Sequence, residues 1–148
     1  MRVVEQFSVA RPPKEVFKYV AVKYFENHTK FDPEVHEMIW RTKAPVSIGT
    51  KGTERRKFAG KRVLLDFEVT DFKPFKFFAL QNTSGPFSLD RSYSLEPISN
   101  GTKVTFVFDM HPKNLPVKLV FPLLRNKFRK SVSDNIHLLK GLLNGERG

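Results

Sequence analysis

Six strand-like segments joined by short connections constrain the fold of this chain more than any other feature. Apolar and polar side chains alternate within each segment, and the segments span residues 35–41, 51–59, 62–72, 75–82, 87–95 and 103–110. Turn-forming sequences separate them, namely SIGTKG, AGK, KPF, SGP and SNG. Connections this short join neighbouring antiparallel strands, because a parallel crossover needs about a dozen residues or more. The sequence therefore predicts an antiparallel sheet of consecutive strands.

The residues before these strands predict one more strand and a helix. Residues 2–10 alternate like a strand. Residues 11–25 have two prolines near their start, followed by apolar side chains at helical spacing, and therefore predict a helix. The polar sequence ENHTKFDPEV comes next, and because Pro33 interrupts it, we expect a loop or short helical turns there.

The C-terminal part of the chain predicts a long amphipathic helix. One helical face is almost entirely apolar, with basic side chains outside it, and consists of Val117, Phe121, Leu124, Phe128, Val132, Asn135, Leu139 and Leu142. Pro122 has no N–H to donate, so it should kink the helix or mark where its regular part begins. The whole order is typical of a bent sheet that grips one long helix, and such a core can retain a cavity because sheet and helix curve apart.

Five pieces of the chain, taken together, resemble the START/SRPBCC superfamily, whose members have the helix-grip fold. The pieces are FSVARPPKEVFKYVA, FDPEV, PVSIGTKG, FEVTDFKPFKFFAL and YSLEPISNGTKVTF. More narrowly, the chain is similar to the polyketide cyclase/dehydrase and coenzyme-Q-binding-like branch. The resemblance implies a single α+β domain over residues 1–148, with a curved antiparallel sheet of about seven strands wrapped around a long C-terminal helix.

The resemblance implies a function only in outline, because one fold serves many functions. The function expected first is binding or transport of a hydrophobic small molecule, such as a lipid, an isoprenoid or a polyketide-like compound, in a cavity between the sheet and the C-terminal helix. A polyketide cyclase or dehydrase is the alternative. Neither function implies a bound cofactor.

An arginine in the middle of an apolar row is the first candidate binding residue. On residues 87–95 the inward positions are apolar except for Arg91, and Tyr93 follows it on the same face. A charge facing a core must be paired or solvated. Arg91 and Tyr93 therefore bind the polar end of a ligand, or Arg91 pairs with a structural acid such as Glu54, or it lies in water at the cavity mouth. Glu54 and Arg56 share the inward face of their own strand, either as a second polar set in the cavity or as a structural ion pair.

The apolar wall of the predicted cavity is aromatic, as the 15 phenylalanines of the chain suggest. The residues expected to line it are Phe67, Phe87, Phe106, Phe108, Phe121, Leu124 and Phe128. Trp40 shares a face with His36 and Met38 and is expected in the core or in the cavity wall, with direct ligand contact as a further possibility.

Catalytic and metal-binding signatures are weak. The chain has no cysteine, no nucleophile motif and no phosphate-binding glycine loop. Tyr93, Arg91 and His36 are the acid–base candidates if the protein is an enzyme. His28, Asp32 and His36 would align on one helix as metal ligands, but Pro33 argues against a continuous helix, so no metal site is predicted.

The net charge of +11 comes mainly from two basic segments, residues 41–62 and 113–130. Such segments attract an anionic membrane surface or an acidic protein, or they simply form a solvated surface. A basic surface module that binds nucleic acid or an anionic membrane is therefore the second alternative function, and of these two partners nucleic acid is disfavoured, because the chain lacks a nucleic-acid-binding motif. The sequence LPVKLVFPLLRNKFRK resembles an interfacial element, although most of its apolar residues should belong to the core. Since no secretion signal and no membrane-spanning run is present, we expect a cytoplasmic protein.

Overall fold

The structure, a computed structural model, describes residues 1–145, and residues 146–148 of the predicted domain lie outside the described residues. The strands are β1 (Arg2–Val9), β2 (Val35–Trp40), β3 (Lys51–Phe58), β4 (Lys61–Lys73), β5 (Phe77–Asn82), β6 (Phe87–Ile98) and β7 (Gly101–Pro112). The helices are α1 (Pro13–Phe17), the short π-helix η1 (Lys18–Val22), α2 (Tyr24–Phe31) and α3 (Leu115–Leu143).

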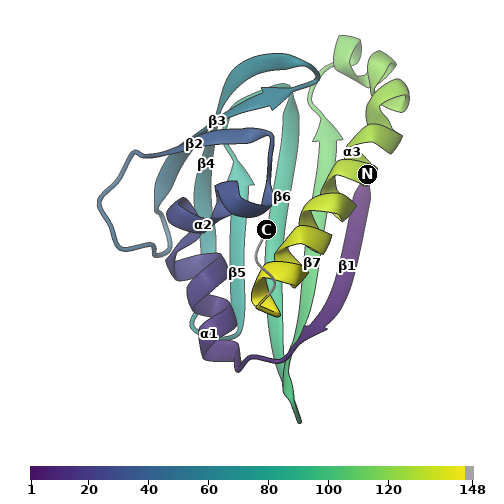
Figure 1. Cartoon of the computed structure of the whole chain (residues 1–148). Coiled ribbons are helices and arrows are strands. Elements are labelled where there is room, and N and C mark those ends of the chain that lie inside the picture. The colour runs from purple at the N-terminus through teal and green to yellow at the C-terminus, as the bar shows by residue number, and fades with distance from the viewer. Residues whose placement is uncertain (146–148) are drawn as a thin grey trace.

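The strands form one antiparallel sheet in the order β1-β7-β6-β5-β4-β3-β2. Strands β2 to β7 are a meander of consecutive neighbours, as the short connections predict, and β1 completes the sheet by pairing with β7. Figure 1 shows the sheet bending around α3, while α1 and α2 cover the part of the sheet that α3 leaves open. The predicted α+β architecture of a seven-stranded curved sheet and a long C-terminal helix is thus confirmed.

Gly52 allows the sheet to pack closely against aromatic side chains. It lies opposite Phe67 in the β3–β4 pairing. A Cβ atom at this position would come within 2.5 Å of Phe67 Cζ and 2.7 Å of Phe25 Cε2. The two rings therefore occupy the space that any other residue at position 52 would need.

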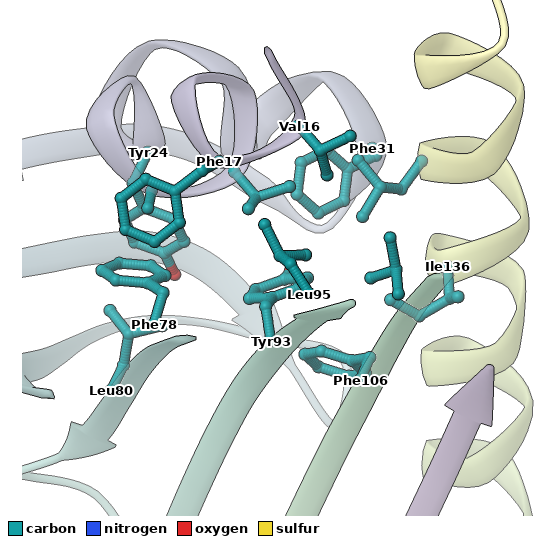
Figure 2. Close-up of a cluster of buried hydrophobic side chains, with 14 of the residues drawn as sticks. Val16, Phe17, Tyr24, Phe31, Phe78, Leu80, Tyr93, Leu95, Phe106 and Ile136 are labelled. Atoms are coloured by element: carbon teal, nitrogen blue, oxygen red, sulfur yellow. The ribbon is translucent and has the colours of Figure 1, made fainter. Parts of the chain in front are cut away.

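The core lies between the sheet and the helices. Val16 and Phe17 of α1, Phe78 of β5, Tyr93 of β6 and Ile136 of α3 meet there, all of them buried. Figure 2 shows these side chains pointing toward one another from the three directions that enclose the core. Within residues 1–145 no helix is both long and apolar enough to cross a membrane.

Helix α2 decides between the two alternatives predicted for this part of the chain. Tyr24–Phe31 is a regular helix of eight residues, so the first part of the polar sequence forms short helical turns and not a loop. Burial of two of its polar side chains stabilises the helix. Asn27 donates a hydrogen bond to the carbonyl oxygen of Tyr19 at 3.0 Å, and His28 faces the interior. Pro33 lies just beyond the C-cap residue Asp32, which fits its expected role as an interruption.

Helix α3 has a buried face that differs in part from the predicted one. The buried side chains are Phe121, Val132, Ile136, Leu139 and Leu143, so Ile136 and Leu143 were missed. Pro122 lies inside the helix, and Figure 1 shows the first turns bending away from the axis of the remainder, as expected where a proline removes a helical hydrogen bond. The expectation that most apolar residues of LPVKLVFPLLRNKFRK belong to the core was wrong, because the four that lie off the predicted apolar face are exposed: Leu115, Leu119, Val120 and Leu123.

Candidate functional site

A cavity of about 200 Å³ lies between the bent sheet and α3. Its walls come from α2, from β3 to β7 and from α3. The large apolar side chains of the wall are Phe31, Phe58, Leu65, Leu80, Leu89, Phe106, Phe108, Met110, Phe128, Val132 and Ile136. Exposed residues mark its mouth, where Lys57 and the turn at Ala59 and Gly60 face Lys127 of α3.

A cluster of charged side chains closes one end of this cavity. Glu54 is its centre and is only 1% exposed. Glu54 Oε1 accepts hydrogen bonds from Arg91 Nη1 at 3.0 Å and from the Tyr24 hydroxyl at 3.2 Å. Glu54 Oε2 accepts one from Arg56 Nη1 at 3.1 Å, and the same Arg56 nitrogen lies 3.3 Å from Asp32 Oδ2. Two carboxylates and two guanidinium groups thus neutralise one another.

This geometry decides between the alternatives for Arg91. The interpretation in which Arg91 pairs with Glu54 is confirmed, and Glu54 with Arg56 also forms the expected structural ion pair. Arg91 still reaches the cavity wall, with its second terminal nitrogen donating to Asn82 Oδ1 at 3.2 Å. Sequence alternation predicted the inward direction of all three charged side chains, since β3 and β6 each place every second residue on that face.

The ion pairs hold both carboxylates in the charged form. Burial alone would raise the pKa of Glu54, but Arg91, His28 and Arg56 more than offset this and lower the pKa from 4.5 to about 2. Asp32 behaves in the same way: burial opposes the charge, while His28 and Arg56 bring its pKa well below the usual range. Burial raises the pKa values of Tyr24 and Tyr93, so both hydroxyl groups stay protonated and can donate hydrogen bonds.

These pKa values predict how stability depends on pH. Because the folded protein holds Glu54 with a pKa below its ordinary value, the stabilisation is present above about pH 4.5 and is lost as the pH falls through 2. At about 1.36 kcal/mol per pKa unit, the Glu54 contribution is roughly 3 kcal/mol, and Asp32 adds to it with the same sign. Urea unfolding at a series of pH values should show the free energy of unfolding falling from about pH 5 downward. The fall should be smaller in Glu54→Gln, and a flat profile down to about pH 2 in the wild type would contradict the assignment.

His28 is a polar residue of the cavity wall that the sequence did not identify as such. It is buried, its ring stacks on Tyr24 with centroids 4.8 Å apart, and its Nε2 lies 3.4 Å from Asp32 Oδ2 and 3.6 Å from Glu54 Oε1. Among the described residues, neither ring nitrogen of His28 has a hydrogen-bond partner of good geometry, and the same holds for Arg91 Nε. The signal was present in the four-residue spacing of His28 and Asp32, which was considered only as a metal motif.

The candidate residues are divided between the cavity and other places. Arg56, Arg91, Tyr93, Phe106, Phe108 and Phe128 line the cavity, and Glu54 lies behind them as the partner of Arg91. Phe87 and Phe121 form a second aromatic cluster in which Phe128 also takes part. Phe67 is buried against Tyr24 and Phe25, and Leu124 is half-buried on α3; neither belongs to the cavity wall. These four side chains face the interior, as predicted, although Leu124 does so only in part. Their positions along the strand or helix place them beyond the cavity.

His36 does not lie where the alternation of β2 predicted, whereas Trp40 packs in the core, the first of its two expected positions. A β-bulge between Val35 and Glu37 shifts the register, so His36 is exposed and does not share a face with Met38 and Trp40. Trp40 stacks on Phe25 with ring centroids 3.7 Å apart, which makes it a core residue outside the cavity wall. His36 therefore does not reach the cavity as an acid–base group.

A family model described as polyketide cyclase / dehydrase and lipid transport matches residues 1–144. Comparison with curated protein sequences gave no match.

Three solved structures share the fold. The protein TTHA0849 from Thermus thermophilus has a TM-score of 0.75 at 16% identity, covering 95% of this chain and 94% of that one. Major latex-like protein 151 from Panax ginseng has a TM-score of 0.68 at 14% identity, covering 95% and 97%. The di-domain ARO/CYC protein StfQ of the steffimycin biosynthetic pathway has a TM-score of 0.75 at 10% identity, covering 97% of this chain and 51% of that one. At these identities the similarity establishes the helix-grip fold and nothing finer.

Proposed function

The chain belongs to the polyketide cyclase / dehydrase and lipid transport family, and we propose that it binds a compact, mostly apolar and uncharged small molecule in the cavity between its sheet and α3. One observation carries the proposal. The cavity has an apolar wall that ends at a charge-neutral cluster containing buried nitrogen atoms without hydrogen-bond partners among the described residues.

The size of the cavity favours a compact ligand. A cavity of about 150 Å³ lined by apolar side chains is large enough to bind benzene. The cavity here is about 200 Å³ and has an open mouth. It suits a molecule of one or two rings, of the kind found among polyketide-like compounds, better than an extended acyl or isoprenoid chain.

The charge of the polar end favours a ligand without a charge. A carboxylate placed beside Arg91 would compete with Glu54, which already binds that guanidinium at 3.0 Å. One negative charge would then remain buried without a partner, at a cost of several kcal/mol. A carbonyl or hydroxyl group avoids this cost, since it can accept a hydrogen bond from the Tyr93 hydroxyl on the cavity wall. In this arrangement the Tyr93 hydroxyl orients the ligand beside the Arg91–Glu54 pair, and Phe106, Phe108 and Phe128 contact its apolar part.

The test compares bicyclic aromatic compounds of one size and two charges. At about pH 7.5, 2-naphthamide and 2-naphthol are neutral, whereas 2-naphthoate is an anion. Titration calorimetry should show the neutral compounds binding at least about tenfold more tightly than the anion, a difference of about 1.4 kcal/mol. Tighter binding of 2-naphthoate would overturn the uncharged ligand but keep the cavity as a binding site.

Native mass spectrometry of the freshly purified protein complements the titrations, because it detects a ligand of unknown shape. A discrete mass released on denaturation, followed by solvent extraction, would identify the natural class of ligand. No co-purifying molecule, together with no binding of either neutral compound, would overturn the proposed function.

A cyclase or dehydratase is the second candidate, and His28 is the observation that favours it. Its two ring nitrogens make no hydrogen bond of good geometry among residues 1–145, its Nε2 lies 3.4 Å from the charged Asp32, and the protonated Tyr93 hydroxyl belongs to the same cavity wall. A base and an acid on one wall are what enolisation or dehydration of a bound polyketide needs. Chemical change of a bound compound, lost in His28→Ala while binding persists, would favour this candidate over a carrier.

A further inference from the structure

The first turns of α3 carry an apolar stripe that none of residues 1–145 covers. Leu115 is 67% exposed, Leu119 is 71% exposed and Leu123 is 84% exposed. A spacing of four residues places the three side chains one above another on the helix surface. Val120, 47% exposed, widens the stripe on one side. Large apolar side chains gathered in this way mark a surface that contacts another apolar phase.

Cations surround the stripe, and no acid lies among them. From Lys113 to Ser133 the chain has six basic residues and no Asp or Glu. Lys118, Arg125 and Lys127 are exposed, and Arg125 lies over the ring of Phe121 at 5.7 Å. Lys130 pairs with Asp134 at 2.6 Å, so its charge is largely compensated.

The β3–β4 hairpin brings further cations to the same end of the molecule. Phe58, near the tip of the hairpin, packs against Phe128 of α3 with ring centroids 5.3 Å apart. Figure 1 shows the hairpin and the first turns of α3 at one end of the molecule. Three exposed cations of this hairpin add to those of α3: Lys57, Lys61 and Arg62.

We propose that this end of the protein docks on an anionic lipid bilayer, with Leu115, Leu119 and Leu123 entering the headgroup–acyl boundary and the surrounding cations pairing with lipid phosphates. An apolar helical stripe flanked by Lys and Arg is the composition of an interfacial helix. Juxtamembrane cations add to such binding by attraction to the negative surface of the membrane.

Charge and shape favour a bilayer over other occupants of this surface. A second copy of the chain would bring the same cations against each other in a symmetric dimer, which opposes association. The stripe consists of side chains that project from the surface of a helix, and fluid lipid accommodates such side chains without a preformed groove. The proposal does not depend on the identity of the cavity ligand. It does place the mouth of the cavity at the membrane, because Lys127 follows Leu123 by one helical turn and lines that mouth.

The experiment measures co-sedimentation with vesicles of phosphatidylcholine and phosphatidylserine at a ratio of about 7:3, against vesicles of phosphatidylcholine alone. The wild type should bind the anionic vesicles, and added salt should weaken the binding. Leu119→Ser/Leu123→Ser should lower the partition coefficient at least about tenfold, since each leucine loses much of its apolar transfer free energy. Leu138→Ser is the matched control: this leucine is also exposed on α3 but lies fifteen residues beyond Leu123, so its replacement should change nothing.

Three outcomes would overturn the proposal. The first is no binding of the wild type to anionic vesicles. The second is binding that Leu119→Ser/Leu123→Ser leaves unchanged, which would assign the interaction to charge alone. The third is a concentration-dependent dimer, seen by sedimentation velocity without vesicles and abolished by the same double substitution. Because all the replaced side chains are exposed, the variants should melt within a few degrees of the wild type, so loss of binding is not loss of fold.

Discussion

Glu54→Gln lowers the free energy of unfolding by about 3–5 kcal/mol, the largest stability effect that we expect from a single charge in this protein. The reason is that Arg91 and Arg56 both depend on the Glu54 carboxylate, at 3.0 Å and 3.1 Å, and the site is almost completely buried. Removing one partner of a buried ion pair leaves the other charge without compensation, which costs far more than the pair itself contributes. Urea unfolding followed by circular dichroism measures the difference.

The matched control is Glu37→Gln on the neighbouring strand. Glu37 binds Arg55 at 2.9 Å, a shorter distance than any in the buried cluster, but both side chains are more than half exposed. Exposed pairs contribute about 0–1 kcal/mol, so this variant should be close to the wild type. Similar losses in the two variants would show that burial does not set the energy of these pairs.

A double substitution separates the ion pair from the loss of a side chain. Glu54→Gln/Arg91→Met removes both charges of the tightest buried pair, while Arg56 keeps Asp32 at 3.3 Å. The double variant should be more stable than the sum of the two single losses predicts, by about 1–3 kcal/mol. Strict additivity would mean that Glu54 stabilises the fold mainly through Arg56 and Tyr24.

The sequence could predict which residues face inward, but not that Glu54 and Arg91 touch. They lie on β3 and β6, which β4 and β5 separate. In a flat sheet, three strand spacings of about 4.8 Å would hold their backbones roughly 14 Å apart. Their 3.0 Å contact depends on the curvature of the sheet and on the reach of the arginine. Alternation along one strand carries no information on that curvature.

The elements themselves were predictable because each has a strong local signal. Short turns defined the meander, and the apolar period defined α3. The errors arose where tertiary packing overrides local pattern. A bulge turned His36 outward, and burial of Asn27 and His28 selected a helix over a loop in a polar sequence.

Ser131→Phe should lower the affinity for a cavity ligand by at least about 100-fold while leaving the protein folded. Ser131 is a half-buried residue of α3 on the cavity wall. A phenylalanine ring at this position fills much of a cavity of about 200 Å³ and gains apolar contacts there, so the cost to stability is small. Calorimetry with 2-naphthol and 2-naphthamide measures the affinity, and thermal unfolding confirms the fold.

Ser133→Phe makes the same substitution on the outer side of the same helix. Ser133 is exposed and its hydroxyl donates a hydrogen bond to Glu5 at 2.8 Å. An exposed contact of this kind contributes little, so both binding and stability should stay close to the wild type. Wild-type affinity in Ser131→Phe would mean that the ligand binds outside the cavity. Equal loss in both variants would mean that added bulk anywhere on α3 disturbs binding. Loss in Ser131→Phe alone would show that the ligand occupies the space between the sheet and α3. Only the ring at position 131 fills that space, whereas the ring at position 133 lies in solvent.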